Sequence, residues 1–276
     1  MNGLALLLGR VRAFVARDFQ LAVSYRLDFF MRMLSILFVV TTLFFISQIF
    51  TGQFEARFTQ WRDPLAAWIT GLAVLNYFMT GFSSLATAIR SEQSQGTLES
   101  VLMTPIGVPT LIIASSAWDF VLVTFHSFLY LFFGWLFFGV TYQGSFLLAF
   151  MFLILTTLVL ASLGIMSASF AMVFKRGDPF ALILGTGSAF FSGVFFPTQL
   201  LSEVAGSAVA NISRLIPTTH GLDGIRRVLI QGQGFAEVRE PMMTLLLFLS
   251  ILLPLSLWVF GRAVRRAKRE GSLIQY

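Results

Sequence analysis

The amino-acid sequence predicts an all-α polytopic membrane protein with six transmembrane helices. The chain of 276 residues is 57% hydrophobic and only 12% charged, with a mean hydropathy of +0.82. Soluble domains are about 25% charged, so a fold that faces water cannot bury this much apolar surface. The apolar residues also fall into stretches of about 20 residues, which is the length that an α-helix needs to cross a bilayer.

The expected spans are separated by prolines, tight turns and charged residues. Pro64 and Pro241 begin the second and the sixth span, because proline favours the first turn of a helix, and "TYQG" at 141–144 joins the third span to the fourth. We expect the six transmembrane helices at residues 29–50, 65–88, 110–140, 145–174, 179–196 and 241–261.

Two further segments differ from membrane spans. Residues 4–26 mix apolar side chains with four arginines, which predicts an amphipathic helix in the membrane interface; a soluble N-terminal segment is the alternative. Residues 198–235 are too long for a turn and too apolar for a free loop. We expect a re-entrant pair of half-helices there, divided by Pro217, with Ser202 as a cap of the first helix and Thr218 or Thr219 as a cap of the second.

Lysines and arginines place both termini on the cytoplasmic side. With both ends inside, 13 of the 19 basic residues lie in inner segments, and the six in outer loops are matched by six acidic residues. Basic residues concentrate on the cytoplasmic side of membrane proteins and near anionic lipid. We therefore expect a multi-pass protein of a bacterial inner (plasma) membrane. The net charge of +6 needs no nucleic-acid partner to explain it.

A polar segment, "RSEQSQGTLESVLMTP" at 90–105, lies between the second and third expected spans. One face of a helix here carries Glu92 and Glu99, and another face carries Leu98 and Leu102. The pattern predicts a short amphipathic helix that ends at the closing proline. Composition alone leaves two interpretations open: a connector on the lipid headgroups, or a helix that docks on a partner.

Two motifs together resemble the ABC-2 type permeases, the membrane subunits of type V ABC exporters. The first is "EQSQGTLESVLMTP" at 92–105, and the second is "FFSGVFFP" at 190–197 followed by "LIPTTHGLDGIR" at 215–226. The order and spacing of the other elements also agree, so the resemblance extends over nearly the whole chain as one domain, residues 1–276.

The resemblance implies that residues 91–104 form a coupling helix that sits in a groove of a cytoplasmic ATPase. The residues expected to couple are Glu92, Gly96, Thr97, Leu98, Glu99, Leu102, Thr104 and Pro105. Six spans are half of the usual set of an ABC exporter, which implies two copies of this chain with two ATPase subunits.

The end of the fifth expected span supplies candidates for an outer gate. Phe195, Phe196 and Pro197 lie where the re-entrant pair would begin. Bulky apolar side chains in such a place can close a pore by excluding water.

The chain has no nucleotide-binding motif of its own. It lacks G-x-x-x-x-G-K-[ST], and no glycine directly precedes a lysine. We expect ATP and Mg²⁺ on the partner ATPase, no cofactor on this chain, and a transport subunit rather than an enzyme. With no cysteine and two isolated histidines, His126 and His220, we expect no metal site.

Asp119 and His126 are candidates for the translocation path. They lie seven residues apart on one face of the third expected span, and ionisable residues inside a membrane are costly and often functional. The alternatives are a structural pair, or a position of Asp119 near the inner interface.

The leading functional hypothesis is the permease half of an ATP-driven exporter, whose cargo is an amphiphilic small molecule, drug or lipid. The GTLE…TP form is similar to that branch of the family, and "RDFQLAVSYRLDFFMRML" at 17–34 lacks the Gly and Trp of the polysaccharide branch. A polysaccharide or glycolipid exporter is the alternative. A secondary transporter or a membrane enzyme fits less well, because the spans offer little for a proton relay or a catalytic cluster.

Overall fold

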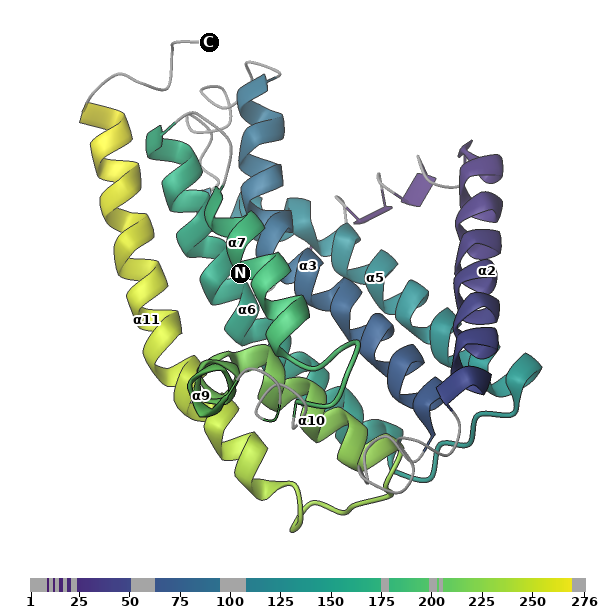
Figure 1. Ribbon diagram of the computed structural model, residues 1–276. Coiled ribbons are helices and arrows are strands. Elements are labelled where there is room, and N and C mark those ends of the chain that lie inside the picture. The colour runs from purple at the N-terminus through teal and green to yellow at the C-terminus, as the bar shows by residue number, and fades with distance from the viewer. Residues whose placement is uncertain are drawn as a thin grey trace.

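A computed structural model of the chain describes residues 24–50, 63–94, 108–174, 179–198 and 206–269, together with the single residues 9, 12, 15, 16, 19, 20 and 203. Within these residues all regular secondary structure is helical (Figure 1). The helices in chain order are α2 (Arg26–Phe50), α3 (Pro64–Ser94), α5 (Val108–Phe138), α6 (Phe146–Phe174), α7 (Pro179–Phe191), α9 (Ser207–Leu215), α10 (Pro217–Leu229) and α11 (Arg239–Arg269).

Five of the helices in the described part of the chain are long and apolar enough to cross a membrane. They are α2, α3, α5, α6 and α11, and they overlap the ranges expected for the first four spans and the last. The prediction of an all-helical membrane fold is confirmed at this level, and the chain is a multi-pass membrane protein.

The fifth expected span, 179–196, is shorter in the structure than we predicted. Its helix, α7, has 13 residues and ends at Phe191, whereas a crossing helix needs about 20. The chain turns immediately afterwards, because Gly193 has a φ of +78°, a left-handed conformation that glycine adopts most readily. This glycine turn is the reason that α7 stops before Phe195.

Helix α3 lies at the centre of the bundle. Phe78 and Phe82 of α3 pack with α6, α10 and α11 in one apolar cluster, which includes Phe152, Leu222 and Leu245. The opening turns of α3 form a second cluster with α2 and α5. The same helix therefore joins both cores.

The segment expected to be re-entrant contains two short helices, α9 and α10, divided at Ile216 and Pro217. The predicted threonine cap of the second helix is wrong: Ile216 is its N-cap and Pro217 its first helical residue, so Thr218 and Thr219 already lie inside α10. Proline suits this first position because its missing N–H has no partner there in any case. Ser202 lies outside the described residues, and the position of the pair within the membrane stays a prediction.

The two ends of the bundle differ in what they carry. Helices α9 and α10 lie at one end, at the bottom of Figure 1, and the C-terminal ends of α3 and α11 lie at the other. The first four residues expected in the coupling helix, 91–94, continue α3 without a break. Residues 95–107 lie outside the described residues.

The described residues of the N-terminal segment, 9, 12, 15, 16, 19 and 20, are all helical. Phe19 packs edge-to-face on Trp118 of α5, with ring centroids 6.0 Å apart. The placement of the N-terminal segment in the membrane interface stays a prediction.

Candidate functional site

The three candidate gate residues lie in one turn, residues 192–198, which follows α7. Phe195 is 48% exposed, and Pro197 is buried. Phe196 is partly buried and meets Phe190 edge-to-face, with ring centroids 5.3 Å apart. The structure thus brings all three residues to one end of the bundle, beside α10.

This turn is held by hydrogen bonds from two directions. On one side Trp68, in the first turns of α3, donates its Nε1–H to the backbone oxygen of Phe195 over 2.8 Å. On the other side Ser213 of α9 donates its hydroxyl to the backbone oxygen of Phe191 over 2.7 Å. The position of the gate candidates is therefore set by helices that are distant in the sequence.

Arg226 of α10 also holds the turn at 192–198, from a buried position. It is 3% exposed, and its Nη1 donates to the oxygen of Gly193 over 2.7 Å. Its Nη2 donates to the oxygens of Ala67 (2.8 Å) and Val194 (3.1 Å). We call these four residues the arginine junction; it joins α3, the turn at 192–198 and α10.

Burial lowers the pKa of the Arg226 guanidinium, and the nearby Asp223 carboxylate raises it. An arginine starts so far above neutral pH that it keeps its charge. The hydrogen bonds of the arginine junction are therefore charge-assisted. Those to Gly193 and Val194 satisfy carbonyls that lie in the turn, outside a helix.

A glycine on α3 makes room for the arginine junction. A Cβ at Gly71 would lie 2.8 Å from the oxygen of Val194 and 2.9 Å from Nη2 of Arg226. Sequence reasoning missed both Gly71 and Arg226, which it counted only as an outer-loop charge. The available signal was weak: an arginine on a helix whose neighbours at 222, 225 and 229 are apolar.

Two cavities of similar size lie beside α10. One, of about 480 Å³, is apolar and lies between α3, α5, α6 and α10. Its few polar groups include the hydrogen-bonded pair Tyr77 and Thr124, and Ser127, which donates to the oxygen of Ala73 over 2.7 Å. A further apolar cavity of about 380 Å³ shares Phe128 with it.

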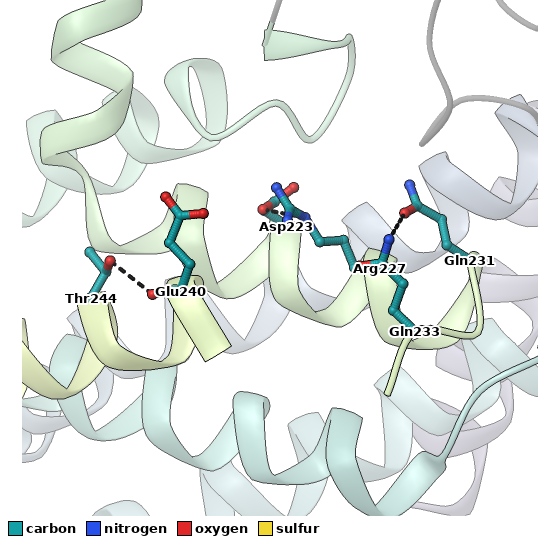
Figure 2. A network of polar contacts seen from close by, with 6 residues as sticks. All are labelled: Asp223, Arg227, Gln231, Gln233, Glu240 and Thr244. Carbon is teal, nitrogen blue, oxygen red and sulfur yellow. Dashed lines mark hydrogen bonds and ion pairs between the residues drawn. The ribbon is translucent and has the colours of Figure 1, made fainter. Parts of the chain in front are cut away.

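The other cavity, of about 510 Å³, is polar. Its wall includes Asp223 and Arg227, whose side chains form an ion pair over 2.9 Å along α10. Glu240, at the start of α11, also lines it, and its backbone oxygen accepts a hydrogen bond from Thr244 (Figure 2). Among the described residues no group of three potential metal ligands occurs.

The remaining candidates lie apart from the arginine junction. Asp119 is exposed and His126 partly buried, and both belong to α5, which supplies no member of that junction. Glu92 lies in the last turn of α3, where only the backbone is described. The other seven coupling candidates, Gly96 to Pro105, lie outside the described residues.

Long apolar helices around a buried polar junction define a multi-pass membrane protein. The family model of the ABC-2 type transporter matches residues 10–230, which include all of α10 and the turn at 192–198. The match covers most of the chain, so the protein belongs to the ABC-2 type transporter family, as its motifs indicated. The membrane domain of this family has no nucleotide-binding site, and the chain is a permease. A search of curated proteins found no significant match.

Proposed function

We propose that this chain is the permease subunit of an ATP-driven exporter, working as a homodimer with a separate cytoplasmic ATPase. The observation that carries this proposal is the family match over residues 10–230. Two features support it: five helices able to cross a membrane, and a sequence without a phosphate-binding loop. Such a chain needs a partner to hydrolyse ATP.

In this proposal the end of the bundle with α9 and α10 faces outward, and both termini are cytoplasmic. The support is the C-terminal end of α11, which holds Arg262, Arg265 and Arg266 and lies at the end of the bundle away from α10 (Figure 1). Arg262 lies over the ring of Trp258, 3.8 Å from its centroid, an arrangement suited to the membrane interface. In this proposal the fifth crossing, expected at residues 179–196, is made by the short helix α7 together with the turn that follows it.

The segment at 91–104 acts as the coupling helix. Its start continues α3, and α3 is the most buried of the candidate spans. A displacement of this segment by the ATPase would be passed directly to the helix that joins both cores, because close-packed interiors transmit strain. Glu92 and Glu99 provide charge contacts, Leu98 and Leu102 provide apolar anchors, and Gly96 permits close approach.

The gate candidates lie at the outer end of the same path. Phe195 is exposed in a single chain, whereas the arginine junction holds the backbone beside it. We expect Phe195 and Phe196 to restrict an outer opening between two copies. Asp119 and His126 of α5 are weaker candidates for the path.

The proposed cargo is an amphiphilic small molecule, drug or lipid. The apolar cavity of about 480 Å³ supports this class, since apolar sites of about 300–1,000 Å³ accept small molecules with few polar contacts. A polysaccharide would require many hydrogen-bonding groups along its path.

The test is copurification of the ATPase followed by transport into vesicles. Glu99→Lys and Gly96→Leu should reduce ATPase binding or uncouple hydrolysis from export, whereas Glu237→Lys, an exposed acid at the opposite end, should change neither. Native mass spectrometry should give two permeases and two ATPases. A complex of one plus one that still transports would contradict the homodimer.

The gate has its own measurement. Phe196→Ala should raise passive leak or basal ATPase activity of the reconstituted complex, and Phe235→Ala, which is 57% exposed, serves as the control. Unchanged leak and unchanged basal hydrolysis at normal expression would count against a gate at this turn.

A further inference from the structure

The polar cavity of about 510 Å³ has the character of a binding site. It is bounded by the turn at 192–198, α9, α10 and the start of α11, and nine of its ten lining residues have polar side chains. The apolar cavity on another face of α10 contrasts with it. Polar side chains that converge on one cavity can bind a polar ligand, whereas an apolar gap between helices cannot.

The charges around the polar cavity favour an anion. Three arginines, Arg214, Arg226 and Arg227, and two acidic residues, Asp223 and Glu240, line it, which leaves one positive charge in excess. Asp223 is bound by Arg227 over 2.9 Å. The three hydrogen bonds of Arg226 described above go to neutral carbonyls and orient its guanidinium, and the carboxylate of Asp223 lies near it as well. A fixed cation in a buried position attracts an anion more strongly than one in water does.

One buried hydroxyl in the wall has no partner within the described part of the protein. Ser192 is 2% exposed and lines the cavity, and its Oγ makes no hydrogen bond there. A buried hydroxyl without a partner is costly, and a ligand oxygen would remove that cost. This observation is independent of the arginines and points to an oxygen-rich ligand.

The structure assigns this polar cavity as a binding site for a phosphate group, with Arg214 and Ser192 as donors and with one more arginine than carboxylates in its wall. The planar guanidinium binds phosphate with two parallel hydrogen bonds, and serine supplies a further donor. The cavity volume is larger than one phosphate needs, so it has room for the rest of a headgroup. The inference concerns this chain alone and does not depend on an ATPase or on export.

The test uses the purified full chain in a maltoside detergent, which carries no phosphate. Calorimetry measures the binding of inorganic phosphate in one arm and of dihexanoyl phosphatidylglycerol in the other, and dihexanoyl glycerol is the lipid without phosphate. Arg214→Gln should weaken phosphate binding about tenfold or more, and Ser192→Ala by a smaller factor. Arg239→Gln is the matched control, since Arg239 is exposed at the same end and outside the cavity wall.

The outcomes separate the two sources of phosphate. Tighter binding of phosphatidylglycerol than of inorganic phosphate identifies a lipid headgroup, and equal binding identifies free phosphate. Because Arg214 is exposed, its substitution leaves the fold intact, and a monodisperse elution profile checks this. The inference is overturned if neither probe binds, if dihexanoyl glycerol binds as well as the phospholipid, or if Arg214→Gln and Ser192→Ala bind like the unmodified chain.

Discussion

Helices α2 and α3 are both long enough to cross a membrane, yet the protein buries one and leaves the other exposed. In the spanning part of α3, 72% of the residues are buried, against 11% in α2. The buried helix is the less apolar of the two. In water the opposite order would be expected, because hydrophobic residues are then driven to the interior.

The difference follows from what drives packing in lipid. Lipid tails are as apolar as leucine, so helices associate through close packing and interhelical hydrogen bonds. Helix α3 offers small side chains at Ala67 and Gly71 for close approach. Helix α2 presents Phe38 and Ile49, each 72% exposed, which suit a surface against lipid or a second copy of the chain.

The largest predicted contrast comes from removing one phenylalanine from each helix. Phe78 of α3 is fully buried and Phe38 of α2 is 72% exposed. Phe78→Ala should lower the free energy of unfolding by about 3 kcal/mol, because the cavity left behind loses its packing contacts. Phe38→Ala should change it by less than about 0.5 kcal/mol.

Reversible unfolding in mixed detergent, followed by tryptophan fluorescence, measures both variants. Equal losses for the two substitutions would show that burial in the single chain does not decide stability, and the comparison of α2 with α3 would fail.

The next contrast tests how α3 is held at the end of the bundle near α10. Arg226→Lys keeps the positive charge but puts all its donors on one nitrogen, in place of the two guanidinium nitrogens that bond Ala67, Gly193 and Val194. We expect a loss of about 2 kcal/mol in unfolding free energy, as for one or two buried charge-assisted hydrogen bonds. Arg239→Lys, on the exposed first residue of α11, should leave stability unchanged.

The arginine junction predicts a local effect as well. Hydrogen exchange of the backbone amides in the turn at 192–198 should accelerate in Arg226→Lys and stay as it is in Arg239→Lys. If the global stability falls while this turn keeps its protection, then Arg226 stabilises α10 by some route other than the carbonyls of that turn.

Much of the bundle could be predicted because its signals are local. The lengths of the apolar stretches predicted five helices that the structure contains. Pro217 divides α9 from α10, as expected. The end of α7 was missed because it depends on one backbone angle, at Gly193, within a stretch whose composition continues to look helical. The turn is favoured by bonds from Trp68 and Arg226, which no local pattern reveals.

The candidate site was predicted unevenly for the same reason. The motif at 190–197 contains the turn that the arginine junction holds, and its role as a gate stays a prediction. Arg226 and Gly71 acquire their contacts only when α3 and α10 meet, 155 positions apart in the sequence. The sequence also did not show that α3 is more buried than α2, because hydropathy identifies a span but not the helices that pack against it.

The smallest predicted contrast concerns single hydroxyls. Ser127 of α5 donates to the oxygen of Ala73 in α3 over 2.7 Å in a buried position, whereas Thr42 of α2 donates to Phe38 within its own helix over 2.9 Å. Interhelical hydrogen bonds in membrane proteins contribute about 0.6 kcal/mol on average, so Ser127→Ala should cost about that much. Thr42→Val removes no contact between helices and should cost less.

Because one measurement cannot resolve so small a difference, both substitutions are best compared in the Arg226→Lys background, whose lower stability brings unfolding to milder conditions. If Thr42→Val costs as much as Ser127→Ala there, then interhelical hydrogen bonds do not account for the central position of α3, and close packing at residues such as Gly71 must account for it alone.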